Sequence, residues 1–240
     1  MLFLTALEQR IIIVSIVQSW PIFYSIFFTY KLLIRSKNPP TLTLSLFFLV
    51  NMIGLILFLV SIFTVYTPFS YLFYLSGYYL FSFSYSFLIL FSWLVLNVDK
   101  IVSKKLIVLI ILIYLISYCY IFLFGIFYNG ISYGPSTGWI PVFTLGFSII
   151  SWLFNFVLFI IPEGYIIYRL INVFQHSPIK RRIFFIWISI ILGFSILNLG
   201  ILYNYLIDNT FYRTIHIFIT LPLNTIAAYL MYSNLVKGLK

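Results

Sequence analysis

The sequence predicts an all-α integral membrane protein in which seven transmembrane helices form one bundle. Three observations support this prediction: 63% of the 240 residues are hydrophobic, only 8% are charged, and the apolar residues gather in long stretches. An average soluble protein has roughly 45–50% apolar and about 25% charged residues. A chain this apolar cannot cover itself with polar groups in water, so we expect it to lie in a bilayer. The same composition excludes a disordered, collagen-like or nucleic-acid-binding protein.

The length of each apolar stretch fits a membrane-spanning helix. Crossing about 30 Å of hydrocarbon takes around 20 mostly apolar residues, and seven segments meet this requirement. They cover residues 11–34, 41–65, 69–98, 106–128, 141–171, 182–206 and 213–236. Because these segments take up most of the chain, we expect residues 1–240 to form a single transmembrane domain.

Individual segments carry further signals. The first, residues 11–34, is too long for the apolar core of a signal peptide, so we expect it to be retained. Only residues 81–87 alternate as a β-barrel strand would, and we assign this run to the third helix. There Ser82 and Ser86 have the small-residue spacing that permits close helix contact. Residues 128–140 are rich in turn formers, and we expect them to form a lid over an outward-facing cavity.

Lysine and arginine residues are distributed very unequally between the two ends of the predicted spans. Only Arg10 and Arg213 lie at one end. The other end receives Lys31, Arg35, Lys37, Lys100, Lys104, Lys105, Arg169, Lys180, Arg181, Arg182, Lys237 and Lys240. The positive-inside rule therefore predicts that the N-terminus lies outside and the C-terminus in the cytoplasm, in a cytoplasmic membrane or an organellar inner membrane. Topology explains the net charge of +10, and we expect no nucleic-acid partner.

Glu163 is the one ionisable residue that clearly lies within a span. Such residues are costly in lipid and are functional candidates by default. Glu163 stands between Pro162 and Gly164, where we expect the fifth helix to kink. Two interpretations stay open. Glu163 faces the bundle interior as a proton or ligand site, or it is protonated or reaches interfacial water and a basic neighbour.

Uncharged polar residues extend this candidate intramembrane site. Asn155, Asn198 and Asn204 are grouped with Glu163, although interhelical hydrogen bonds that serve packing are the simpler role for such side chains. The same packing role is expected of Gln18, Asn51, Asn224 and His216. The sixth span also carries a stripe of residues at helical spacing, which we expect to be a helix contact face. It consists of Ser189, Gly193, Leu197, Gly200 and Asn204.

Signals for catalysis are weak. The four acids, Glu8, Asp99, Glu163 and Asp208, lie on different segments, and the sequence has no cluster of histidine and cysteine. Catalysis requires a nucleophile, base or metal held within mutual reach. We therefore expect no enzymatic activity, no metal site and no cofactor. The single cysteine, Cys119, excludes an internal disulfide.

Three short motifs follow one another in the second half of the chain. They are Tyr133-Gly134-Pro135, then Ser177-Pro178 followed by Lys180-Arg181-Arg182, and then Asn198 with Tyr203 beyond it. Their order, together with the span count and predicted orientation, resembles the seven-helix N-terminal sensory region of prokaryotic histidine kinases. Two features differ from that family. Ile183 replaces the glutamine that usually follows the basic pair, and residues 1–240 contain no segment that we expect to form a kinase domain.

The resemblance implies a receptor-like or sensor-like module that signals through separate partners. Arg169, Lys180, Arg181 and Arg182 would then contact anionic lipid, or couple the helices to a protein partner on the cytoplasmic side or within the membrane. Setting the topology is their simpler role. Two other functions stay open, a structural or assembly subunit of a larger membrane complex and a transporter. Membrane lipids are expected partners in every case.

Overall fold

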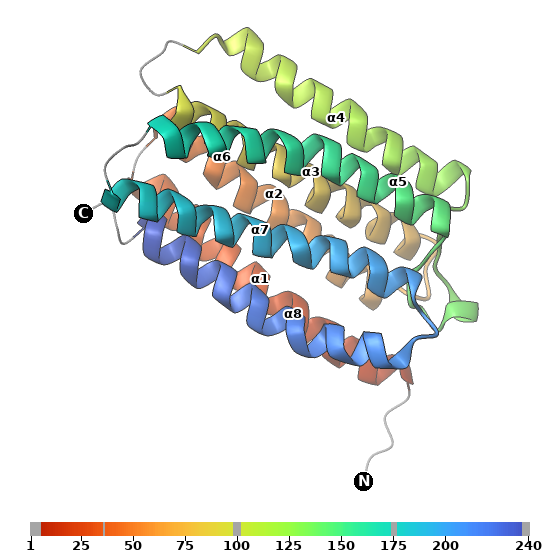
Figure 1. Ribbon diagram of the computed structural model, residues 1–240. Coiled ribbons are helices and arrows are strands. Elements are labelled where there is room, and N and C mark those ends of the chain that lie inside the picture. Colours follow the sequence, from red (N-terminus) through yellow and green to blue (C-terminus); the bar gives the residue numbers. More distant parts are fainter. Residues whose placement is uncertain (1–5, 36, 98–101, 174–176, 237–240) are drawn as a thin grey trace.

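The computed structural model describes residues 6–35, 37–97, 102–173 and 177–236, and it contains seven helices that are long and apolar enough to cross a membrane (Figure 1). The predicted all-α architecture with seven apolar spans is therefore confirmed, whereas the orientation of the termini stays a prediction. The helices are α1 (Ala6–Arg35), α2 (Pro39–Phe63), α3 (Ser70–Leu96), α4 (Lys104–Phe127), α5 (Leu145–Asn155), α6 (Ile161–Val173), α7 (Ser177–Tyr205) and α8 (Thr210–Met231). Together, α5 and α6 form the fifth span.

The fifth span is interrupted by a π-helical turn, η2 (Phe156–Ile160), between α5 and α6. The sequence places the irregularity at Pro162, whereas the structure places it one turn earlier. Pro162 has no N–H with which to bond the carbonyl of Leu158, four residues before it. That carbonyl accepts a hydrogen bond from the Tyr114 hydroxyl of α4 at 2.5 Å. A neighbouring helix thus satisfies the backbone group that the proline leaves without a partner.

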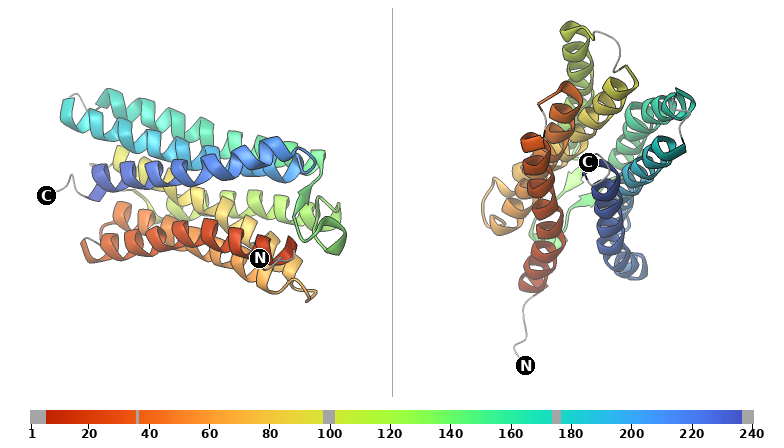
Figure 2. Two further views of the ribbon diagram at one scale, coloured as in Figure 1. Left: turned by 90° about the horizontal axis from the view of Figure 1, so that it is seen from below. Right: turned by 90° about the vertical axis from the view of Figure 1, so that its left-hand side faces the viewer.

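Helix α3 occupies the centre of the bundle and α4 its edge. In the most apolar part of each span, 61% of the α3 residues are buried, against 17% for α4. Viewed along the helix axes, α1, α2 and α3 stand opposite α7 and α8, while α4 projects from the group (Figure 2). The outward faces of the helices carry large exposed apolar side chains, such as Ile116, Phe23 and Phe218. Lipid tails can cover such faces, which water could not do favourably.

The closest helix contact joins α2 and α3 at two glycines. A methyl group on Gly54 would lie 2.8 Å from the backbone nitrogen of Phe81, and one on Gly77 would lie 2.9 Å from the carbonyl oxygen of Gly54. The two backbones therefore approach as closely as glycine allows, the arrangement that small residues permit between membrane helices. Ser82 and Ser86 of α3 are also buried.

A short hairpin forms the connection between α4 and α5. Strands β1 (Ile131–Ser132) and β2 (Val142–Phe143) pair antiparallel, and a 3-10 turn, η1 (Pro135–Thr137), lies between them. The Tyr133 ring stacks on Tyr74 of α3 with ring centroids 5.5 Å apart. Trp139 packs edge-on against Tyr133. We call this end of the bundle the hairpin end and the opposite one the basic end.

The described cations keep the unequal distribution that the sequence shows. Arg10 and Arg213 lie near the starts of α1 and α8, at the hairpin end. At the basic end lie Lys31, Arg35, Lys37, Lys104, Lys105, Arg169, Lys180, Arg181 and Arg182. Lys100, Lys237 and Lys240 are outside the described residues.

The α2–α3 contact yields a stability prediction. Gly54→Ala forces a methyl group against the α3 backbone, and overpacking of this kind costs about 1–3 kcal/mol. Gly200→Ala is the matched control, because a methyl group there meets no atom within 4 Å and alanine favours a helix by roughly 1 kcal/mol. Thermal unfolding in one detergent should show a lower midpoint for Gly54→Ala and an unchanged or higher one for Gly200→Ala. Equal midpoints for wild type and Gly54→Ala would contradict the close contact.

The orientation can be tested with single cysteines. Ser136, in the hairpin loop, and Ser103, before α4, are exposed at opposite ends of the bundle. In a background with Cys119→Ser, a membrane-impermeant maleimide should label Ser136→Cys from outside intact cells or vesicles. Ser103→Cys should be labelled only after the membrane is opened. Labelling of both positions from one side would exclude the seven-span arrangement, and the reverse pattern would invert the predicted orientation.

Candidate functional site

A cavity of about 580 Å³ lies between α1, α2 and α3 on one side and α7 and α8 on the other. Its lining runs from Arg10 to Phe28 on α1 and from Arg213 to Met231 on α8. Each pair is 18 residues apart, which corresponds to about 27 Å of helix. The cavity thus follows most of the bundle length, and its volume falls in the range of small-molecule sites. The hairpin borders one end through Tyr133, Gly138 and Ile140.

The small residues of α7 create much of this space. The sequence predicts that the stripe from Ser189 to Asn204 is a helix contact face, but all five of its residues line the cavity. A methyl group on Gly193 or Gly200 would meet no atom within 4 Å. Three residues of the stripe bond to other helices: Ser189 donates to the Ala227 carbonyl at 2.6 Å, Asn204 donates to the Tyr74 hydroxyl at 3.1 Å, and the Gly193 carbonyl accepts from the Tyr85 hydroxyl at 3.2 Å. Space is left where Gly193 and Gly200 carry no side chain.

Two arginines from different helices line the cavity at the hairpin end. Arg213 donates from Nη2 to the Tyr203 hydroxyl at 3.0 Å and from Nη1 to the Ile207 carbonyl at 3.3 Å. Its guanidinium also lies over the Tyr203 ring, 4.7 Å from the centroid. The Nε of Arg213 and the Nε and Nη1 of Arg10 are buried and find no acceptor in the described part of the chain. No aspartate or glutamate is among the described lining residues, so this end of the cavity is positively charged.

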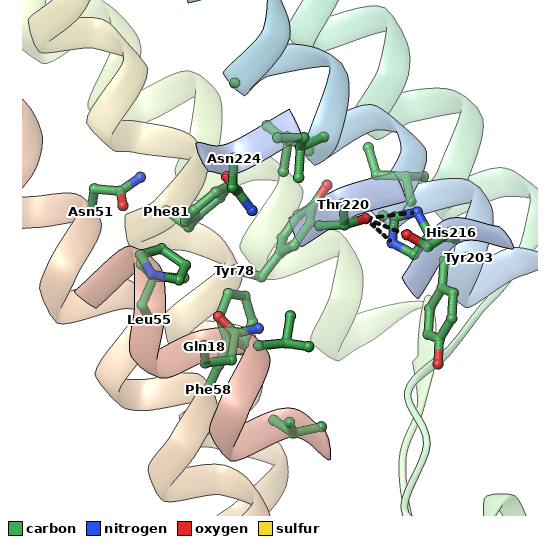
Figure 3. Close-up of a pocket in the computed structure, with 18 of the residues that line it drawn as sticks. Gln18, Asn51, Leu55, Phe58, Tyr78, Phe81, Tyr203, His216, Thr220 and Asn224 are labelled. Atoms are coloured by element: carbon green, nitrogen blue, oxygen red, sulfur yellow. Dashed lines mark hydrogen bonds between the residues drawn. The ribbon is translucent and has the colours of Figure 1, made fainter. Parts of the chain in front are cut away.

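Uncharged polar side chains from three helices line the middle of the cavity. Gln18 of α1, Asn51 of α2 and Asn224 of α8 lie around the same space (Figure 3). The side-chain amides of these three residues form no hydrogen bond with another described residue. Beside them on α8, Thr220 donates to the His216 carbonyl and lies 3.3 Å from its Nδ1. The sequence predicts packing roles for Gln18, Asn51, Asn224 and His216, whereas the structure turns them toward the cavity.

Aromatic and aliphatic side chains line the cavity toward the basic end. Phe28 of α1 stacks on Phe48 of α2 at 4.8 Å, and Phe47 packs edge-on against Tyr85 of α3. The Tyr85 hydroxyl donates to the Gly193 carbonyl at 3.2 Å, so its polar atom is satisfied. The cavity therefore changes along its length from charged, through polar, to apolar.

The four intramembrane residues singled out from the sequence do not form one site. Only Asn204 lines the cavity. Asn198 bonds within α7, to the Phe194 carbonyl, and its own carbonyl accepts from the Trp152 indole at 3.3 Å. Asn155 accepts from the Tyr118 hydroxyl at 3.3 Å, and Glu163 accepts from Ser92 of α3; neither Asn155 nor Glu163 is among the residues that line the cavity.

Glu163 lies buried between helices, with only 2% of its surface exposed. The Ser92 hydroxyl of α3 donates to Oε1 at 2.6 Å, whereas Oε2 has no partner among the described residues. Together with the bond from Tyr114 to Leu158, this contact fixes the start of α6 against α3 and α4. The Ser92–Glu163 hydrogen bond therefore contributes to the contact between the fifth span and α3.

The basic residues proposed for coupling lie at the surface of the basic end. Arg169 of α6 contacts Tyr165 one turn earlier, through a 3.1 Å hydrogen bond and over the ring. Lys180 is exposed. Arg181 and Arg182 border a second depression with Phe185 of α7 and Leu230 of α8. Cations at this depth can hold a helix end against anionic lipid or a partner.

Histidine, cysteine, aspartate and glutamate do not gather in groups of three anywhere in the described ranges. Comparisons with protein-family models, with curated proteins and with solved structures found no match for this chain. The seven apolar helices define the class, a multi-pass α-helical membrane protein. The cavity is its best candidate for a functional site.

Sequence reasoning missed the two arginines of the cavity because it counted them only for topology. One signal was present. Arg10 and Arg213 stand at the start of apolar helices, on the end of the bundle that otherwise lacks cations. Which face of each helix they occupy cannot be read from spacing alone, because an apolar helix shows no polar face against which to set them.

The Ser92–Glu163 contact yields a second stability prediction. Ser92→Ala leaves the carboxyl without a hydrogen-bond donor among the described residues, and an unsatisfied buried group costs about 1–3 kcal/mol. Thermal unfolding in detergent should show that loss, while Ser86→Ala should cost less because Ser86 bonds only within its own helix, to Phe83. In a double-mutant cycle, Ser92→Ala should have little effect once Glu163→Leu is present. Additive effects of the two substitutions would refute the coupling.

Proposed function

We propose that the protein is a receptor-like or sensor-like membrane module that binds a ligand in the central cavity and acts on a separate partner at the basic end. One observation carries the proposal. Gln18, Asn51 and Asn224 project from three helices into one cavity without partners among the described residues. Polar side chains that line a cavity without partners favour an occupant that can bond with them. A ligand in this place would contact both helix groups at once.

The position of the cavity supports a coupling route. Helix α7 lines the cavity through Gly193 and carries Arg181 and Arg182 at the basic end. Helices α1 and α8, which flank the cavity, contain Pro21 and Pro222 within their spans. Each proline removes a backbone hydrogen bond and lets a helix bend. A ligand that alters the spacing of α1 and α8 would therefore shift the end of α7 where a partner can bind.

The resemblance of the second half to a sensory region favours the same function over transport or a purely structural role. A sensor of this kind has two arrangements of its helices, and a ligand changes their populations only if it binds them with different affinity. The relevant measurement is therefore a helix displacement on ligand binding, together with the binding itself.

Filling the cavity tests the proposal. Gly193→Trp places a large side chain in open space inside the cavity, and Gly164→Trp does so at a glycine outside its lining. In detergent, the fluorescent lipophile Nile red should bind to wild type and to Gly164→Trp with similar affinity, and at least tenfold more weakly to Gly193→Trp. Spin labels on Lys31→Cys and Lys180→Cys should show that the distance between these two positions changes when Nile red saturates the wild-type cavity. The distance should not change when Gly193→Trp is present. Equal binding by the two tryptophan variants, or binding without displacement, would contradict the proposed sensor.

A further inference from the structure

We infer that the cavity binds an amphipathic organic anion, with its acidic head group between Arg10 and Arg213 and its apolar chain directed toward Phe28 and Met231. This inference rests on the proposed function, because it names the ligand class of the same cavity. It concerns two residues to which the sequence assigned topology alone.

The hairpin end of the cavity carries two positive charges, those of Arg10 and Arg213. A buried arginine is stable only when its charge and N–H groups find partners. Three N–H positions on Arg10 and Arg213 are buried without an acceptor among the described residues, and no described lining residue is acidic. Both arginines line the same end of the cavity, where Arg213 is hydrogen-bonded to the lining residue Tyr203. An anion between them would supply acceptors and relieve the repulsion, whereas a cation would add to it.

The two arginines present their N–H groups from different helices, α8 and α1. Arg213 is held in place by the Tyr203 ring and by the carbonyl of Ile207, so the direction of its unsatisfied Nε–H is fixed. The free groups of Arg10 come from α1, the helix that borders the cavity opposite α7. Planar guanidinium groups match carboxylate and phosphate oxygens in pairs. A head group with two or three such oxygens would bridge α1 and α8.

The rest of the lining sets the body of the ligand. The cavity continues for about 27 Å of helix from the arginines to Phe28 and Met231. Its apolar part is lined by rings from α1, α2 and α3, which suit a hydrocarbon chain. Gln18, Asn51 and Asn224 lie between these two regions and suit a polar substituent on the chain. A long-chain acid and an anionic bilayer lipid share this chemistry.

The test uses 12-hydroxyoctadecanoate as probe and octadecane-1,12-diol as its neutral counterpart, with the full chain in phosphatidylcholine nanodiscs. The acid should bind wild type at least tenfold more tightly than the diol. Arg10→Gln and Arg213→Gln should each lower the affinity for the acid at least tenfold, about 1.4 kcal/mol. The affinity for the diol should change by less than twofold. Arg213→Lys keeps the charge, so its affinity for the acid should lie between those of wild type and Arg213→Gln. Arg169→Gln is the control, because Arg169 is exposed at the basic end.

Two further comparisons show whether the ligand class or the cavity itself is wrong, and whether the natural ligand is a bilayer lipid or a free acid. If acid and diol bind wild type equally, or if the arginine variants weaken both alike, the inference is wrong. The proposed cavity then still stands, provided that Gly193→Trp blocks both compounds. If Gly193→Trp blocks neither, the proposed function itself fails. Nanodiscs containing phosphatidylglycerol should inhibit binding of the acid if a bilayer lipid is the natural occupant, and should not do so if the ligand is a free acid.

Discussion

The structure depends on one constraint, that a chain in hydrocarbon must satisfy its polar backbone groups within itself. Seven helical spans satisfy these groups through their own backbone hydrogen bonds along most of their length. Where some helices begin, side chains accept the hydrogen bonds of the first N–H groups. Asn38, Thr144 and Asn209 each accept a hydrogen bond from a backbone N–H in the first turn of α2, α5 and α8. The same rule explains the fifth span, where the Tyr114 hydroxyl bonds the carbonyl that Pro162 leaves without a partner.

Glycines contribute in two different ways to the packing of the bundle. Gly54 and Gly77 bring α2 and α3 into backbone contact. Gly193 and Gly200 of α7 instead line the cavity and face open space. A glycine permits close approach but does not cause it. The difference lies in whether an opposing helix is there to fill the space.

The buried polar groups accordingly serve two purposes. Glu163 and Asn155 each accept a hydrogen bond from a hydroxyl of another helix, which joins the fifth span to α3 and α4, although Oε2 of Glu163 and Nδ2 of Asn155 have no partner among the described residues. Those of the cavity, from Arg10 and Arg213 to Gln18, Asn51 and Asn224, gather around one volume and leave several donors without acceptors among the described residues. Unsatisfied polar atoms in a cavity are expensive in a folded protein unless a ligand, ion or water bonds to them. The proposed binding function rests on the gathering of these polar groups around one cavity.

The sequence by itself determined the class of the protein and its seven spans, because the length and apolarity of each segment follow directly from bilayer thickness and the cost of exposed backbone. It also identified Glu163 as unusual, since one carboxyl among apolar residues is visible without a fold. Only the tertiary structure decided that Glu163 contacts Ser92, that Asn198 bonds within its own helix, and that Arg10 and Arg213, more than 200 residues apart, share a cavity. The physical reason is rotational. In a helix that is apolar on all sides, the position of a residue along the chain sets its depth, but contacts with neighbouring helices set the direction it faces.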